Sequence, residues 1–122
     1  GISDPIAAGQ KILELGPSFV IVKKGEYGSV LVDKNNTAVL PAFPLAIEDV
    51  IDPTGAGDSF AGGFMGYIAT VQEINFEEMR TAMAWGTVTA SFTLQSFGLD
   101  GLVKASKDKI RSRMVEFTEF AK

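Results

Sequence analysis

The chain has 122 residues, a formal net charge of −4 at pH 7 and 46% hydrophobic residues, which fits one globular domain and excludes a disordered chain. The acidic balance argues against a nucleic-acid surface, and no apolar run reaches the ~20 residues that a membrane-spanning helix needs. Cysteine and histidine are both absent, so disulfides, thiol chemistry and the most common general base are excluded, and a cytoplasmic location is expected.

The N-terminal part of the sequence predicts one helix followed by short strands. Residues 5–15 have a helical pattern that is closed by Gly16 and Pro17. Three short runs then have the apolar or β-branched composition of strands, and residues 33–36 provide a hairpin turn between the second and the third. These predicted strands are residues 19–22, 29–32 and 37–40.

The C-terminal part is predicted to be mainly helical, after a short strand at residues 47–50. Asn75 is the expected N-cap of the second of three helices, and Glu78, three residues later, completes a capping box. Residues 1–122 are therefore expected to form one α/β domain with no internal boundary. The three predicted helices are residues 55–71, 76–97 and 106–121.

Residues 52–58 read Asp-Pro-Thr-Gly-Ala-Gly-Asp and directly precede a predicted helix. Two glycines two positions apart let the backbone turn sharply and approach a ligand closely. The amides of residues 55–58 would lie at a helix N-terminus, where unpaired N–H groups and the helix dipole attract phosphate. Because Asp58 would repel a phosphate, we expect it to face a neutral hydroxyl that attacks the phosphate. The alternative is an ordinary helix N-terminus with Asp58 as a capping residue.

The longer run at residues 52–64, Asp-Pro-Thr-Gly-Ala-Gly-Asp-Ser-Phe-Ala-Gly-Gly-Phe, resembles the C-terminal signature of the PfkB or ribokinase family of carbohydrate and nucleoside kinases. The resemblance implies a ribokinase-like three-layer α/β/α sandwich, of which this chain is the C-terminal part only. It also implies that Asp58 is the catalytic base. The implied anion hole for the migrating phosphoryl group consists of Gly55, Ala56, Gly57 and Asp58.

Residues 23–28, Lys-Lys-Gly-Glu-Tyr-Gly, resemble the family's strand-turn element that flanks ATP. The resemblance implies that the Gly25 amide meets the nucleotide, whereas Gly28 belongs to the turn. Many members carry threonine at the position of Lys23, so a lysine contact to phosphate would replace a hydroxyl contact there. Two glycines three apart also suit a tight turn between strands, which is the alternative interpretation.

The resemblance implies two further binding regions. In relatives the helix around Gly86 and Thr87 borders the adenine, so both residues are candidates for nucleotide binding. Many relatives also bind a monovalent cation such as K⁺ through the first aspartate of the signature, which makes Asp52 and Thr54 candidate ligands. The alternative is that Asp52 only starts the turn before Pro53.

The implied activity is transfer of the γ-phosphoryl group of ATP, with Mg²⁺, to an alcohol of a sugar or nucleoside. The half of the kinase that would grip this alcohol is expected upstream of Gly1, so residues 1–122 alone are expected to be inactive. The expected partners are the small-molecule substrate, that N-terminal half and a second copy of the chain. The alternatives are a nucleotide-binding module without catalysis and a structural α/β domain.

Overall fold

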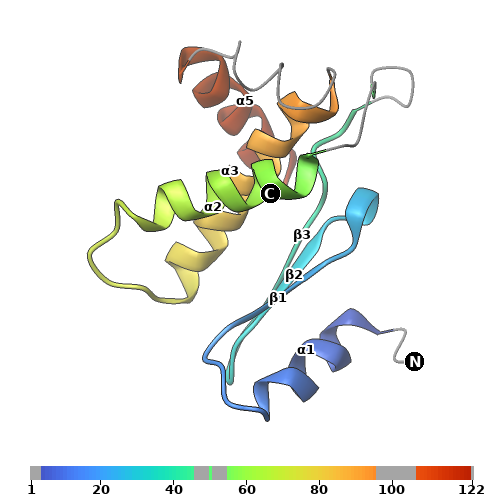
Figure 1. The fold of residues 1–122 in the computed structure, drawn as a ribbon, viewed down its shortest axis with the longest axis vertical. Helices are drawn as coiled ribbons and strands as arrows, with labels where there is room; N and C mark the ends of the chain where they lie inside the picture. Colours follow the sequence, from blue (N-terminus) through green and yellow to red (C-terminus); the bar gives the residue numbers. More distant parts are fainter. Residues whose placement is uncertain (1–3, 46–49, 51–54, 96–106, 122) are drawn as a thin grey trace. The chain divides into compact units, whose positions relative to one another are not determined.

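The computed structural model describes residues 4–45, 50, 55–95 and 107–121. The chain divides into a first unit, Gly1–Ala42, and a second unit, Phe43–Lys122, and each unit is described by itself (Figure 1). The predicted strand at residues 47–50 lies outside the described residues, except for Val50.

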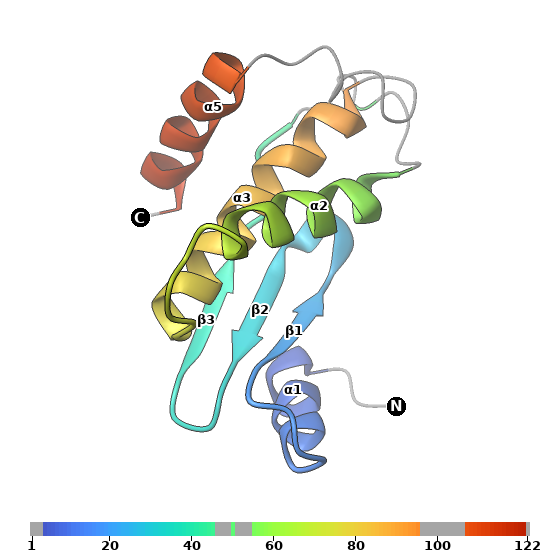
Figure 2. The same cartoon turned by 60° about the vertical axis from the view of Figure 1, so that its left-hand side comes forward.

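The described residues of the first unit form one α-helix, the short 3-10 helix η1 (Gly25–Tyr27) and a three-stranded antiparallel sheet with β2 in the centre (Figure 2). Val20 lies opposite Val32 between β1 and β2, and Ser29 lies opposite Leu40 between β2 and β3. Helix α1 packs against β1 and β2. The elements are α1 (Pro5–Leu13), β1 (Val20–Lys23), β2 (Ser29–Val32) and β3 (Thr37–Leu40).

Local side-chain signals set the bounds of these elements. Asp4 caps α1 by accepting a hydrogen bond of 2.9 Å from the Ile6 amide. In the hairpin turn the Asp33 carboxylate accepts hydrogen bonds from the amides of Asn35 and Asn36, at 2.8 and 2.6 Å. The strands on either side of this turn have exactly the predicted bounds, and the first strand is displaced by one residue.

The core of the first unit centres on β2. Val30, Leu31 and Val32 are consecutive and all buried, so both faces of this strand are covered. Helix α1 approaches the sheet closely at Gly9, where an added Cβ would lie 3.0 Å from a methyl carbon of Val32. In β1, by contrast, Ile21 and Val22 are only half-buried and Lys23 is exposed, so this strand is not buried on both faces.

Among the described residues of the second unit there are three helices, of which α2 and α3 pack along each other and α5 packs on α3 (Figure 2). Phe117 of α5 is fully buried. Among the helices that the structure describes, none has both the length and the apolar character to span a membrane. The helices are α2 (Ala56–Ile68), α3 (Phe76–Leu94) and α5 (Lys107–Phe120).

Two glycines let α2 and α3 approach closely. A Cβ added at Gly63 would lie 2.8 Å from the Trp85 carbonyl oxygen and would overlap the Thr89 side chain. A Cβ added at Gly86 would lie 2.8 Å from the Phe60 carbonyl oxygen and 3.0 Å from its ring. Gly63 and Gly86 therefore serve helix packing, whereas nothing lies within 4 Å of the Cβ positions of Gly62 and Gly66.

This close approach predicts opposite effects for two alanine substitutions in α2. Gly63→Ala is expected to lower the free energy of unfolding by about 1–3 kcal/mol, because the new methyl group overpacks the contact with α3. Gly62→Ala is the matched control, since nothing lies within 4 Å of its Cβ position. It is expected to raise the free energy of unfolding by about 0.5–1 kcal/mol through helix propensity. Urea unfolding measures both values, and equal effects would contradict the packing account.

Candidate active site

Gly55 is the N-cap of α2 and adopts a left-handed conformation with φ of 84°. Because it has no side chain, it makes no side-chain hydrogen bond to the amides of the first turn. This backbone angle favours glycine over any residue with a Cβ. The first hydrogen bond inside the helix joins the Ser59 amide to the Gly55 carbonyl oxygen at 2.9 Å. The amides of Ala56, Gly57 and Asp58 come before this bond, so they have no acceptor within the helix. No acceptor from the described residues meets them, which leaves three donors at the positive end of the helix dipole.

Asp58 lies in the first turn of α2 with its carboxylate exposed, and Gly57 is exposed beside it. The next two residues, Ser59 and Phe60, are buried. The first turn therefore has an open side, which carries a carboxylate and the amides that have no acceptor among the described residues, and a closed side, which faces α3. Asp58 is the third residue of α2 and not its N-cap, which is Gly55, and an acidic side chain in the first turn also interacts favourably with the helix dipole.

A buried hydrogen bond on the closed side of this turn was not predicted from the sequence. The hydroxyl oxygens of Ser59 and Thr93 lie 2.5 Å apart, and their residues are 2% and 0% exposed. The contact joins the first turn of α2 to the last turn of α3. No pattern in the local sequence singles out this pair, since α3 also carries Thr89 on the side that faces α2.

The structure places Gly86 and Thr87 in the middle of α3. Phe60 occupies the space beside Gly86, and the Thr87 hydroxyl donates a hydrogen bond of 2.9 Å to the Met83 carbonyl oxygen within the helix. Helix packing alone therefore explains why residue 86 is a glycine. A role of Gly86 and Thr87 in nucleotide binding stays a prediction.

The second predicted nucleotide contact lies in the first unit, where residues Gly25–Tyr27 form the short 3-10 helix η1. The Gly25 side of this turn is open, since nothing lies within 4 Å of its Cβ position. Gly28 has φ of 100° and lies against the Leu40 carbonyl oxygen, so this glycine is required by the turn, as predicted. Lys23 is exposed at the end of β1, and Ser29 opposite it has a buried hydroxyl without a partner among the described residues.

The predicted monovalent-cation ligands, Asp52 and Thr54, lie outside the described residues. Within the parts of the chain that the structure describes, no group of three acidic, histidine or cysteine side chains could hold a metal ion.

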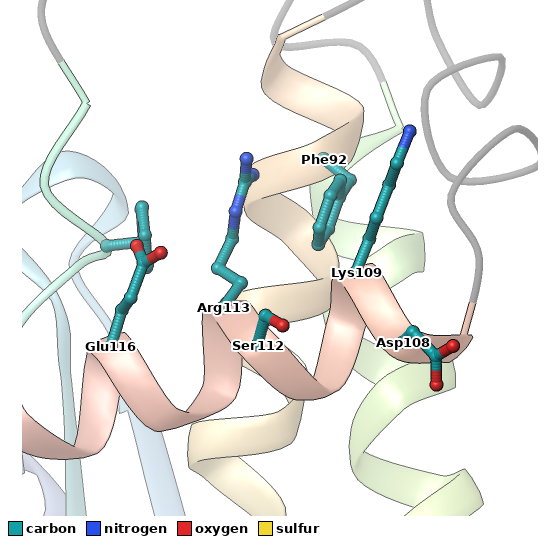
Figure 3. Close-up of a pocket in the computed structure, with 7 residues that line it drawn as sticks. Phe92, Asp108, Lys109, Ser112, Arg113 and Glu116 are labelled. Atoms are coloured by element: carbon teal, nitrogen blue, oxygen red, sulfur yellow. The ribbon is translucent and has the colours of Figure 1, made fainter.

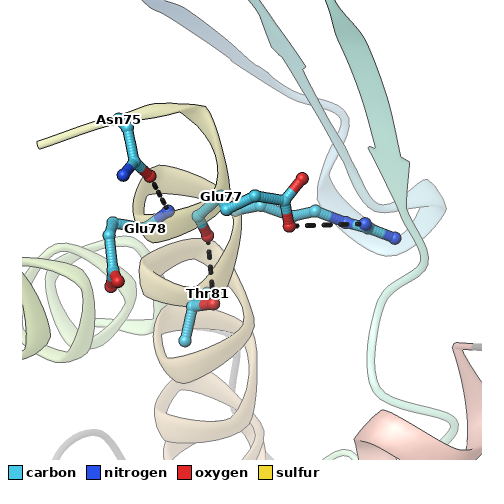
Figure 4. A network of polar contacts seen from close by, with 5 residues as sticks. Asn75, Glu77, Glu78 and Thr81 are labelled. Carbon is cyan, nitrogen blue, oxygen red and sulfur yellow. Dashed lines mark hydrogen bonds and ion pairs between the residues drawn. The ribbon is translucent and has the colours of Figure 1, made fainter.

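Asn75 is the N-cap of α3, as predicted (Figure 4), whereas the hydrogen bonds of the described residues place the Glu78 carboxylate on Tyr67 and not in the predicted capping box. The Asn75 side-chain oxygen accepts a hydrogen bond of 2.9 Å from the Glu78 amide. The Glu78 carboxylate accepts a hydrogen bond from the Tyr67 hydroxyl near the end of α2, so it ties two helices together. Arg80 pairs with Glu77 at 4.0 Å on the exposed side of the same turn.

The hydrogen bond between Tyr67 and Glu78 predicts that the free energy of unfolding falls at alkaline pH. The hydrogen bond to Glu78, followed by burial and the charge of Glu78, raises the pKa of Tyr67 above its usual 10.0. A pKa that is raised in the folded state contributes stability below pH 10, and this stability is lost as the pH rises through the folded value. Tyr67→Phe is expected to lower the free energy of unfolding by about 1 kcal/mol at pH 7, and the difference should shrink above pH 10. Tyr27→Phe, at an exposed position, is the control for urea unfolding across this pH range.

A cavity of about 330 Å³ lies between α3 and α5 and contains none of the anion-hole residues (Figure 3). Arg113 extends from α5 with its guanidinium carbon 3.8 Å from the centre of the Phe92 ring and 5.0 Å from that of Phe43. The guanidinium also donates a hydrogen bond of 3.0 Å to the Ser91 hydroxyl. These contacts hold α5 on α3. The residues that line the cavity therefore have a role in helix packing.

The chain is similar in sequence to kinases of sugars and nucleosides. It is 30% identical to the ribokinase of Mus musculus over 110 residues, which cover 88% of this chain and 33% of that protein. It is 32% identical to the adenosine kinase of Saccharomyces cerevisiae over 98 residues, which cover 79% of this chain and 27% of that protein. The chain therefore spans about a third or less of the length of these relatives.

Solved structures share the fold. The ribokinase of Thermotoga maritima matches 90% of this chain with a TM-score of 0.71 and 27% identity, over 34% of its own length. The aminoimidazole riboside kinase of Salmonella enterica, complexed with aminoimidazole riboside and an ATP analogue, matches 93% of this chain with a TM-score of 0.78 and 23% identity, over 37% of its own length. The predicted ribokinase-like α/β fold is thus confirmed.

The same relationship appears at the level of the family. Residues 2–105 match the profile of the pfkB family carbohydrate kinases, and this range includes the glycine-rich N-terminus of α2 and all of α3. On this evidence the chain belongs to the pfkB family of carbohydrate kinases.

Proposed function

We propose that this chain supplies the phosphate-binding helix terminus and the catalytic base of an ATP-dependent sugar or nucleoside kinase. The observation that carries the proposal is the open first turn of α2, where three amides without acceptors among the described residues lie beside the exposed carboxylate of Asp58. Membership of the pfkB family supports the reaction class. The ATP analogue in the Salmonella enterica neighbour supports ATP as the donor.

The proposed chemistry uses charge stabilisation and positioning. Asp58 accepts the proton of the attacking alcohol while its oxygen forms a bond to the γ-phosphorus, and the bond from that phosphorus to the oxygen of the ADP leaving group breaks. The amides at the start of α2, from Gly55 to Asp58, stabilise the negative charge on the transferring oxygens. Mg²⁺, when bound to the ATP phosphates, supplies further charge neutralisation.

The remaining predicted contacts complete the donor side in this proposal. Gly25 offers its open backbone to the nucleotide, and the exposed Lys23 side chain is a candidate contact for a phosphate. Gly86 and Thr87 stay candidates for the adenine border. Asp52 and Thr54 stay candidates for a monovalent cation such as K⁺.

The acceptor alcohol belongs to a sugar or a nucleoside, since relatives of both kinds match the chain. We propose that acceptor contacts lie mainly in a further segment of a complete kinase, because the chain spans only 27–33% of those relatives. Catalysis requires that acceptor and donor are held in line with water excluded. The 122 residues alone are therefore expected to bind ATP without transferring its phosphoryl group at a useful rate.

A transfer assay tests this proposal. The complete kinase is incubated with Mg-ATP and a panel of sugars and nucleosides, in parallel with the 122-residue chain. Transfer to at least one acceptor by the complete kinase, and not by the chain alone, is expected. If the complete kinase binds ATP but transfers no phosphoryl group, it is a non-catalytic nucleotide-binding module. If it neither binds ATP nor transfers the group, the chain is a structural domain. Robust transfer by the 122-residue chain alone would refute the proposal that the acceptor contacts lie in a further segment.

A further inference from the structure

The hydrogen bond between Ser59 and Thr93 lies in the same helix turn as the candidate base, on the buried side of that turn. Ser59 follows Asp58 in the first turn of α2, and Thr93 lies in the last turn of α3. Both side chains are buried, at 2% and 0% exposure, and their oxygens are 2.5 Å apart. A buried hydroxyl costs free energy unless it finds a partner, so each hydroxyl depends on the other.

Stability alone gives little reason for a polar pair at this place. Apolar residues of the same shape can replace a buried hydrogen-bonded pair with little change in stability. The packing of α2 on α3 also has other anchors, namely the contacts at Gly63 and Gly86. A hydrogen bond differs from an apolar contact because it has a preferred distance and direction.

The first turn of α2 needs such a directional restraint. Its N-cap, Gly55, has no side chain to fix the turn, and Gly57 adds further backbone freedom. Among the side-chain hydrogen bonds of the described residues, the contact to Thr93 is the one that restrains this turn. Displacement of the turn would move the Asp58 carboxylate and the neighbouring amides together, relative to bound substrates.

We propose that Ser59 and Thr93 are positioning residues for phosphoryl transfer, and that their hydrogen bond fixes the rotation of the first turn of α2 about the helix axis. The inference rests on the proposed function of Asp58. It predicts that loss of the hydroxyl pair reduces turnover far more than it reduces stability, because misplacement of reacting groups by about 1 Å can cost on the order of 10²-fold in rate.

The test uses hydroxyl variants of the complete kinase. Thr93→Val keeps the shape of the side chain but leaves the Ser59 hydroxyl without a partner, whereas the double variant Ser59→Ala/Thr93→Val removes both hydroxyls. The double variant is expected to lose about 10- to 100-fold in kcat with KM for ATP and Tm close to wild type. Thr93→Ser restores a hydroxyl and is expected to restore most of kcat. Thr118→Val is the control, because Thr118 is exposed and bonds only the Met114 carbonyl oxygen within α5.

Two readouts separate failure of this inference from failure of the proposed function. Asp58→Asn is assayed in parallel, and full turnover of that variant would refute the proposal that Asp58 is the catalytic base. If Asp58→Asn is inactive but the double variant keeps wild-type kcat, or if Thr93→Ser is as slow as Thr93→Val, the positioning role is wrong. Amide hydrogen exchange gives a readout that does not depend on turnover. The amide at position 59 is expected to exchange faster in the double variant than in the wild-type protein, while the amides of α5 exchange at the same rate. Equal exchange at position 59 in the two proteins would contradict the proposed restraint.

Discussion

Asp58→Asn in the complete kinase is expected to lower kcat by a factor of about 10²–10⁴, which is the usual contribution of a positioned general base. The asparagine has nearly the same shape but cannot accept the proton of the attacking alcohol. The affinity for ATP is expected to stay the same or to increase, because the substitution removes a negative charge beside bound phosphate. Steady-state kinetics and calorimetric titration with an ATP analogue measure the two effects separately.

A second aspartate in the chain provides a matched control for this prediction. Asp108 is also an exposed residue in the first turn of a helix, α5, and has no place in the candidate site. Asp108→Asn is expected to leave kcat unchanged. If Asp58→Asn also keeps kcat within a few-fold of wild type, Asp58 is not the base and serves only the charge balance of the helix N-terminus.

Gly57→Val in the complete kinase is expected to abolish measurable ATP binding. Gly57 is exposed in the first turn of α2, and its amide is one of the three donors without an acceptor among the described residues. A branched side chain at this position would cover the amides and keep a phosphate at a distance. Loss of several charge-assisted hydrogen bonds at about 1.5–3 kcal/mol each corresponds to a fall in affinity of at least about 100-fold.

Gly62→Val is the control for this substitution, because Gly62 is exposed in the same helix and nothing lies within 4 Å of its Cβ position. Both variants carry the same change in helix propensity, so a difference between them reports on the anion site. Unchanged ATP affinity in a folded Gly57→Val protein would show that phosphate binds somewhere other than the start of α2.

The elements that were predicted correctly depend on short-range signals. The strands at residues 29–32 and 37–40 are fixed by a turn in which Asp33 binds the next amides, and the start of α3 is fixed by Asn75. Helix ends were less accurate: α2 was predicted to reach residue 71 but ends at Ile68. Composition continues across a helix end, so no residue in this stretch marks the stop as clearly as a cap marks the start.

The start of α2 was predicted from the local sequence, whereas the chemical roles of its residues stay predictions. The glycines of residues 55–57 and the aspartate after them specify an open helix N-terminus, and the structure has this geometry. The supporting contacts were not predictable, because Ser59 and Thr93 are 34 positions apart and Tyr67 and Glu78 are 11 apart. Such pairs depend on how α2 packs on α3, which a local pattern does not contain.

The most direct test of the central claim is the ¹H–¹⁵N spectrum of the complete kinase during titration with a non-hydrolysable ATP analogue. The claim is that the start of α2 binds the phosphate of ATP through backbone amides. The account predicts that the amide resonances of Ala56, Gly57 and Asp58 shift most strongly among those of α2, and that the amides of α5 hardly move. Binding that leaves these three amides unmoved, or no binding at all, would contradict the account.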